Sequence, residues 1–240
     1  MNTIRNENET TETMTVLIGC EESQAVTLAF RNAGHEAYSC DFKACSGGHP
    51  EWHIQGDVFK AIASRKWDFI GLHPTCTKMT LSGNRHYGVG KPRHYERLDA
   101  VEWTINLWQK ACAAAEMVYM ENPLGAMNGD NRLPKPQIVQ PFYFGDSAMK
   151  TTCLWLHGLP FLYHNKTRNL FDNEVTHVSR GEIVVFKSGK SMPKWYADAA
   201  KLNDYDRAEI RSKTFPGIAN AMATQWSKLK ANTLNQPICL

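Results

Sequence analysis

Short apolar runs alternate with amphipathic segments over the first half of the chain. Residues 15–19 (TVLIG) are rich in β-branched side chains and end in glycine, a pattern typical of a buried strand. Residues 23–32 carry their apolar side chains mostly on one side and are followed by Gly34, which predicts a helix and its end. Further strands are predicted at 36–41, 53–58, 67–72 and 117–123, and further helices at 58–65 and 98–115. This alternation favours right-handed β-α-β units, so we expect an α/β fold with a doubly wound, mostly parallel sheet.

The pattern changes after residue 123. Residues 125–137 combine Gly, Asn and Pro, which predicts a loop. Three β segments are predicted beyond it, at 138–145, 152–162 and 182–187. A final helix at 216–229 places Ile218, Met222 and Trp226 on one apolar stripe. We therefore expect a small β-containing region, followed by a helix that returns to the core.

The composition indicates the class of protein and the cellular compartment to expect. The chain has 240 residues, 42% of them apolar, which suits one large globular domain. No apolar run approaches the length that spans a bilayer, and residues 1–13 are a polar lead-in without the apolar region of a secretory signal. The seven cysteines lack the spacing of a disulfide scaffold, which favours a reducing cytoplasm. A net charge of +3 says little about a polyanionic partner.

Polar side chains gather where the predicted strands end. These strand-end groups are Gly19-Cys20-Glu21, Asp41, Asp57, Pro74-Thr75-Cys76 and Glu121-Asn122. Ligands bind at the carboxyl ends of the strands in parallel α/β sheets. Carboxylates and a thiol at one edge of a sheet are hard to explain by packing alone, so this edge is the candidate site.

Two of the acids suit a nucleoside. Asp41, at the end of the second strand, could accept from both hydroxyls of a ribose, and Asp57 from an amine of adenine. The alternative is that both are turn residues or helix caps, roles that Asp fills well. The first loop, GCEESQ, lacks a phosphate-binding glycine pattern and carries two acids, so a cofactor without phosphates fits better.

Cys76 is a candidate nucleophile. It follows a buried strand, and Lys78, Arg85 and His86 come soon after, so we expect its pKa to be lowered. A thiolate that adds to C6 of cytosine, with Glu121 as the acid at N3, would make C5 nucleophilic toward an electrophilic methyl group. The alternative is an inert, half-buried thiol.

The order of these motifs resembles that of the DNA (cytosine-5) methyltransferase family, especially its small phage-type members. The segments that carry the resemblance are VLIGCEES, SCDF, GDV, HPTCTKMTLSG and MENP, supported by MKTTCLWLHGLP and RSKTFPGIANAMATQW. The resemblance implies a Rossmann-like fold that uses S-adenosylmethionine, DNA as partner, no membrane and no metal, and a phage protein in the cytoplasm of a bacterial host. It leaves the oligomeric state open.

The resemblance also implies roles for individual residues. The catalytic residues are Cys76, Glu121 and Asn122. The cofactor-binding residues are Gly19, Cys20, Glu21, Ser23, Asp41, Asp57, Val58, Pro74 and Asn220. The DNA-binding residues are Arg85, His86, Lys91, Arg93 and Lys150. The implied parts are a lead-in (1–13), a catalytic core (14–124), a target-recognition or accessory region (125–203) and a returning helix (204–231).

The sequence departs from the family pattern at three places. Thr75 separates Pro74 from Cys76, LIGCEES replaces the usual Phe-x-Gly-x-Gly loop, and Pro123 follows Glu121-Asn122 where valine is usual. Two other functions stay open: a catalytically idle nucleic-acid-binding relative, and an enzyme that uses a free nucleotide or a modified cofactor.

One loop offers a competing interpretation. Cys40, Cys45, His49 and His53 have a spacing within reach of a zinc site. Because zinc would sit beside Asp41 and no second ligand cluster follows, we expect a solvated or base-facing loop instead.

Overall fold

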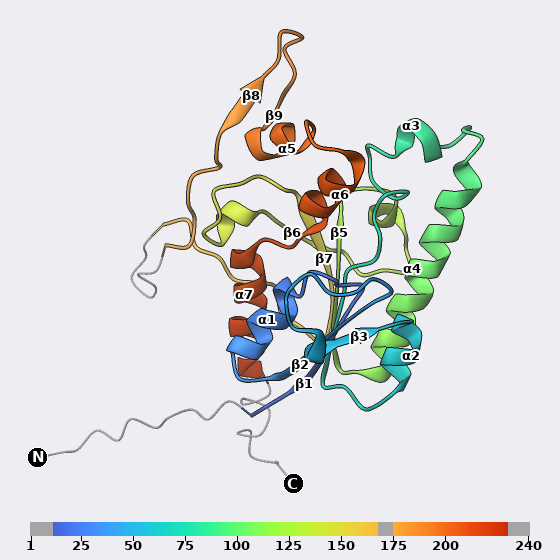
Figure 1. Ribbon diagram of the computed structural model, residues 1–240, viewed down its shortest axis with the longest axis vertical. Helices are drawn as coiled ribbons and strands as arrows, with labels where there is room; N and C mark the ends of the chain where they lie inside the picture. Colours follow the sequence, from blue (N-terminus) through green and yellow to red (C-terminus); the bar gives the residue numbers. More distant parts are fainter. Residues whose placement is uncertain (1–11, 168–174, 230–240) are drawn as a thin grey trace, which may run out of the picture.

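The computed structural model of the chain describes residues 12–167 and 175–229, which form one central sheet with helices on both faces (Figure 1). The strands of the sheet are β1 (Thr15–Gly19), β2 (Glu36–Asp41), β3 (His53–Gln55), β4 (Phe69–Leu72), β5 (Met117–Pro123), β6 (Gln137–Val139) and β7 (Thr152–His157). Their order is β3-β2-β1-β4-β5-β7-β6. The first five are parallel, β7 runs antiparallel to β5, and β6 antiparallel to β7. The predicted doubly wound, mostly parallel α/β sheet is confirmed.

Four helices cover the two faces of the sheet. On one face lie α1 (Ala25–Asn32) and α7 (Pro216–Trp226), and on the other lie α2 (Val58–Ala63) and α4 (His94–Ala114). The apolar stripe predicted for the last helix is buried, and the Trp226 ring packs 5.4 Å from that of Tyr119 on β5. This packing returns the end of the chain to the core.

Helix α4 begins at His94, before the first residue that the apolar pattern predicts. The added turn contains Arg97, which is buried although it is charged. Its side chain is hydrogen-bonded to the loop that follows β4, so tertiary contacts stabilise a turn that has no apolar stripe of its own.

Two strands of the expected accessory region belong to the sheet. Strand β7 pairs with β5 along its length, and β6 continues the sheet beyond it. The described residues of 158–203 lie outside the sheet and contain the hairpin of β8 (Ile183–Val185) and β9 (Ser191–Pro193) and the helix α5 (Lys194–Ala199). Figure 1 shows this hairpin projecting from the same end of the molecule as α3 (Asn84–Tyr87).

The other described elements are short. They are α6 (Asp204–Ser212) and three single 3-10 turns, Pro50–Trp52, Ala126–Gly129 and Pro141–Tyr143. Within the described residues, no helix combines the length and the apolar character needed to cross a bilayer. The predicted lead-in, residues 1–13, lies mostly outside the described residues.

Candidate active site

A glycine on β4 makes room for a buried tyrosine at the centre of the site. A Cβ atom on Gly71 would lie 2.3 Å from Cε1 of Tyr119, so only glycine fits there. The Tyr119 ring therefore crosses the neighbouring strand, fully buried, and its hydroxyl lies 2.6 Å from Nε2 of His73. Burial, together with the charges of Glu21 and Glu121, raises the pKa of Tyr119 well above its ordinary value, so the phenol keeps its proton.

His73 joins the tyrosine to the predicted catalytic acid. Its Nδ1 atom lies 3.3 Å from Oε2 of Glu121, and the side chains of both residues are only 9% exposed. Burial alone would raise the pKa of Glu121, but the hydrogen bond from His73 and the charge of Lys150 outweigh it and lower the pKa below its ordinary value. The carboxyl group is therefore ionised at neutral pH, inside a site that excludes most water.

Cys76 lies in a tight turn just beyond β4. Its carbonyl oxygen accepts from the backbone N–H groups of Met79 (2.9 Å) and Thr80 (3.0 Å). The side-chain amide of Asn122 donates to the carbonyl of Pro74 (2.9 Å), which ties this turn to the end of β5. Asn122 thus has a clear structural task in holding the loop that presents the thiol.

The expectation of a lowered pKa at Cys76 is wrong for the protein without substrate. Burial raises the pKa of the thiol, the negative charge of Glu121 raises it further, and only Lys150 and a backbone hydrogen bond lower it. Of the cations expected to act, Lys78 is paired with Glu96 at 3.0 Å, and Arg85 and His86 are exposed to water. Sequence neighbours do not supply the electrostatics here, because the strongest influences come from β5 and from the segment before β7.

Lys150 is a cation whose charge lowers the pKa of both the Cys76 thiol and the Glu121 carboxyl group. Its ammonium group donates to the carbonyl oxygen of Lys213 at 2.9 Å, which fixes the side chain. Its predicted contact with DNA stays a prediction.

Arg97 is a residue of this site that the sequence analysis missed. Its guanidinium donates to the carbonyls of Lys78 (2.7 Å) and Thr80 (3.1 Å) and to Oδ1 of Asn84 (2.5 Å). These three bonds clamp the loop after Cys76 onto α4. Nothing in the linear pattern separates Arg97 from the exposed Arg93 nearby.

The other four predicted DNA-binding residues lie on an exposed loop around α3. Arg85, His86, Lys91 and Arg93 are all exposed to solvent. Arg93 is also bonded to Glu96, with its Nε 2.5 Å from the carboxylate. The loop therefore presents a basic surface on the side of Cys76.

The predicted cofactor half of the site lies at the ends of β1, β2 and β3. Burial and the charges of Asp41, Cys40 and Asp57 raise the pKa of Cys20 to about 12, which places these groups close together. Oδ1 of Asp41 accepts from the N–H of Lys43, and Oδ1 of Asp57 from that of Phe59, each at 2.9 Å. Both acids therefore have the turn and cap roles that the sequence left open.

This edge still fits a cofactor of the expected kind. Both aspartates are only partly buried, and among the described residues only Oδ1 of each is hydrogen-bonded. The remaining oxygens can accept from hydroxyl or amine groups, and an acidic edge suits a cofactor with a positive charge. These carboxylate acceptors thus fit S-adenosylmethionine better than a dinucleotide.

Glu21 has a role that the sequence analysis did not assign. Its carboxylate accepts from the N–H of Val26 (2.6 Å), the N–H of Thr27 (3.2 Å) and the hydroxyl of Thr27 (2.7 Å). It is 4% exposed and satisfies backbone N–H groups at the start of α1. Its predicted contact with the cofactor stays a prediction.

The remaining predicted cofactor residues occupy varied positions. A Cβ atom on Gly19 would lie 2.6 Å from Cγ2 of Val58, so these two residues pack the end of β1 against α2. Ser23 is half-buried, and Asn220 is exposed on α7. Gln24, which the sequence analysis did not single out, is buried and bonds both the N–H (3.1 Å) and the carbonyl (2.8 Å) of His49.

The loop considered for zinc is held by other contacts. Both ring nitrogens of His53 are engaged, with Oγ of Ser39 and the carbonyl of Lys43, each at 2.8 Å. The His49 ring stacks on Trp52 with centroids 4.1 Å apart. Across residues 12–167 and 175–229 there is no group of three or more His, Cys, Asp or Glu side chains placed to hold a metal ion.

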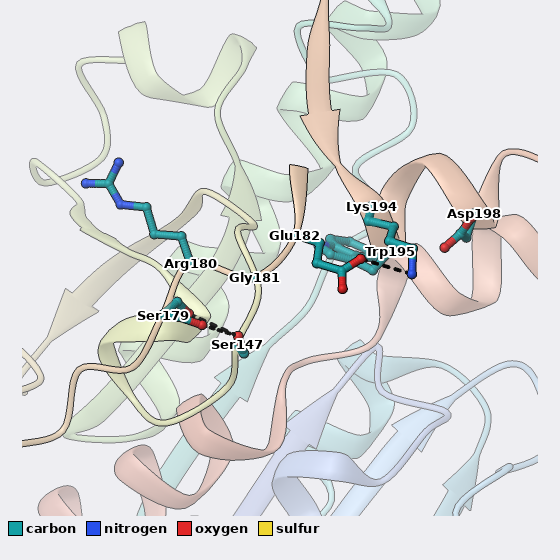
Figure 2. Close-up of a pocket in the computed structure, with 8 residues that line it drawn as sticks. All are labelled: Ser147, Ser179, Arg180, Gly181, Glu182, Lys194, Trp195 and Asp198. Atoms are coloured by element: carbon teal, nitrogen blue, oxygen red, sulfur yellow. Dashed lines mark hydrogen bonds and ion pairs between the residues drawn. The ribbon is translucent and has the colours of Figure 1, made fainter. Parts of the chain in front are cut away.

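A pocket of about 690 Å³ opens beside α5 and the start of β8 (Figure 2). It is lined by Ser147, Ser179, Arg180, Gly181, Glu182, Lys194, Trp195 and Asp198. Figure 2 shows the Ser147–Ser179 hydrogen bond and the Glu182–Lys194 ion pair. Trp195 donates to the carbonyl of Met149, the residue before Lys150, so the pocket borders the segment that carries this lysine. None of the predicted site residues lines it.

Comparison with protein-family models and with curated proteins finds no match. Comparison with solved structures does. An Entamoeba histolytica methyltransferase, EhMeth, gives a TM-score of 0.53 at 12% identity, over 94% of this chain and 100% of the other. The Schizosaccharomyces pombe Dnmt2 methyltransferase gives 0.50 at 10%, with the same coverage.

A third structure is described as a DNA modification methyltransferase encoded within an Escherichia coli prophage. It gives a TM-score of 0.42 at 11% identity, over 60% of this chain, and this chain spans 46% of its length. The first two likenesses cover nearly the whole chain. The chain therefore has the Rossmann-like α/β fold of methyltransferases, as its motifs predicted.

Proposed function

We propose that this protein transfers a methyl group from S-adenosylmethionine to C5 of cytosine in DNA, through a covalent adduct of Cys76 with a flipped base. One observation carries the proposal: the loop that holds Cys76 after β4 is tied through the Asn122–Pro74 hydrogen bond to the end of β5, where the buried Glu121 lies, and the charge of Glu121 reaches the thiol. In a methyltransferase fold, a thiol paired with an acid suits addition to an electron-poor ring.

The chemistry begins with the thiol and the acid. The Cys76 thiol gives its proton to water, and Sγ of the thiolate bonds to C6. The electron pair of the C5–C6 double bond moves through the ring, and N3 takes a proton from Glu121. When Glu121 holds that proton, the negative charge that raises the pKa of Cys76 is gone, so the two steps support each other.

The later steps restore the thiol. C5 takes the methyl group, for which bound S-adenosylmethionine is the donor. The C5 proton then passes to water, the C6–S bond breaks, and the proton on N3 returns to Glu121. Asn122 keeps the thiol at its place throughout by holding Pro74.

The substrate must present C6 to the thiol. C6 is shielded in a stacked duplex, so the base has to leave the stack. Arg85, His86, Lys91 and Arg93 on the exposed loop, with Lys150, supply cations for the phosphates beside it. The β8–β9 hairpin and the pocket of Figure 2 lie in the region assigned to target recognition, and we assign them contacts with the flanking duplex.

Trapping of the covalent adduct tests the proposal. The purified protein is incubated with S-adenosylmethionine and a duplex that contains 5-fluorocytosine, in which loss of the C5 substituent is blocked. We expect the mass of protein plus DNA plus one methyl group, dependent on the cofactor. Cys76→Ser should give none, whereas Cys112→Ser, which changes a half-buried thiol on α4, should trap normally. Cofactor and DNA binding without any adduct would overturn the proposal and favour an idle nucleic-acid-binding relative.

A further inference from the structure

A buried chain of three side chains connects Tyr119, His73 and Glu121. The distances are 2.6 Å from the tyrosine oxygen to Nε2 and 3.3 Å from Nδ1 to Oε2 of Glu121. His73 directly follows β4, Glu121 lies on the neighbouring strand β5, and 48 positions separate the two residues. Neither His73 nor Tyr119 was among the predicted site residues.

The hydrogen-bond partner of Nε2 of His73 is the hydroxyl group of Tyr119. A tyrosine hydroxyl can accept from the Nε2–H of a charged imidazolium and from that of the neutral tautomer that keeps its proton on Nε2. Tyr119 can therefore hold the Nε2–H of His73 in both states, while Nδ1 faces Glu121 and exchanges a proton with it.

We propose that His73 is a positioning residue that supplies Glu121 with its proton: the proton moves from Nδ1 of the imidazolium to Oε2, while Nε2 keeps its own proton and donates a hydrogen bond to the oxygen of Tyr119. This inference rests on the proposed function. The transfer leaves a neutral imidazole and a carboxylic acid, which is the form that N3 of cytosine requires. When N3 gives the proton back, it returns through Glu121 to His73, so the cycle balances.

Several charged or polar groups surround this pair, among them the thiol of Cys153 on β7, whose pKa burial and the charge of Glu121 raise. Thr214, before α7, places its hydroxyl 3.5 Å from Nδ1 of His73. Lys150 acts on Glu121, and Glu21 acts on Tyr119. Cys76 faces Glu121 from the loop after β4. Lys150 favours the ionised carboxylate, so a proton on Glu121 needs a donor as close as His73.

The test uses the substitution His73→Gln, whose amide can still donate to Glu121 but cannot carry a proton. The first readout is the single-turnover methylation rate against pH. On this proposal the pair keeps a transferable proton to higher pH than an isolated carboxyl group, because the imidazole can hold it. We expect His73→Gln to methylate DNA about 100-fold more slowly than the native protein at pH 7.5. The rate should recover partly in acid, because the pH range in which the rate falls off moves to lower pH.

The second readout does not depend on activity. The side-chain carboxyl of Glu121 is followed by ¹³C NMR as the pH is lowered. His73 lowers the pKa of Glu121, so in His73→Gln the carboxyl should titrate at higher pH. A rate limb that moves to lower pH while the carboxyl titration moves to higher pH is the signature of a shared proton, whereas a purely structural histidine would move the carboxyl titration without moving the rate limb. Tyr119→Phe, which removes only the hydroxyl, should give a smaller loss of rate in the same direction.

The two proposals fail in different ways. If the native protein traps 5-fluorocytosine DNA but His73→Gln slows methylation by one factor at every pH, the role of His73 is overturned and the methylation stands. If the native protein traps no DNA, the function is overturned, and the proton supply with it, whatever the NMR titration shows.

Discussion

The two halves of the candidate site are built differently. At the ends of β4 and β5, polar side chains are buried and bonded to partners far along the chain, as in the pair of His73 and Glu121. At the ends of β1, β2 and β3, the acids are partly exposed and bonded to their own neighbours, Asp41 to Lys43 and Asp57 to Phe59. The first arrangement fixes geometry and proton positions for chemistry, whereas the second leaves carboxylate oxygens to meet a ligand that comes and goes.

The largest effect should follow from the thiol. We expect Cys76→Ser to abolish methyl transfer, because serine is a poor nucleophile at its ordinary pKa. S-adenosylmethionine affinity, measured by calorimetry, should be nearly unchanged, since the thiol belongs to the other half of the site. Substantial turnover by this variant would remove Cys76 from the mechanism.

The second largest effect is expected for the substitution Glu121→Gln. The glutamine amide can still bond the edge of the base, but it has no proton to give as charge builds on the ring. We expect a loss of about 100-fold or more in single-turnover rate, with DNA affinity at matched salt largely preserved. An equal, small effect on both quantities would mean that Glu121 only supports the turn into Asn122 and Pro123.

Asp41→Ala probes the more exposed half. We expect S-adenosylmethionine binding to weaken by about 1–3 kcal/mol, the range for hydrogen bonds to a charged group. The methylation rate at saturating cofactor should change little, because Asp41 lies outside the buried network. Unchanged affinity by calorimetry would reduce Asp41 to a turn residue.

The same contrast explains what the sequence could predict. The sheet followed from apolar runs, and Cys76, Glu121, Asp41 and Asp57 followed from their places after predicted strands. Residues whose task depends on distant partners were missed. His73 faces a carboxylate 48 positions away and a hydroxyl 141 positions away, and no local pattern marks such a residue.

The pKa shift of the Cys76 thiol was predicted in the wrong direction for the same reason, because it depends on residues that are distant in the sequence. The expected lowering of the pKa of Cys76 relied on Lys78, Arg85 and His86, which are near in sequence. In the folded protein, burial and Glu121 prevail. Likewise, β6 and β7 carry no signal that separates strands of the main sheet from strands of an accessory region, because membership depends on pairing with β5.

The smallest expected effect concerns the reactivity of Cys76 without substrate, and it compares the two halves directly. Because burial and Glu121 raise the pKa of this thiol, its alkylation by iodoacetamide should be slow at pH 7 and should still be rising above pH 9, since only the thiolate reacts. Glu121→Gln removes one of the two causes, so the rate profile should move to lower pH, whereas Asp41→Asn should leave it in place. Peptide mass spectrometry assigns the alkylated residue, which separates Cys76 from the other thiols. If Asp41→Asn moved the profile as far as Glu121→Gln, the two halves would share one electrostatic field, and the division between a buried chemical half and a more exposed binding half would be wrong.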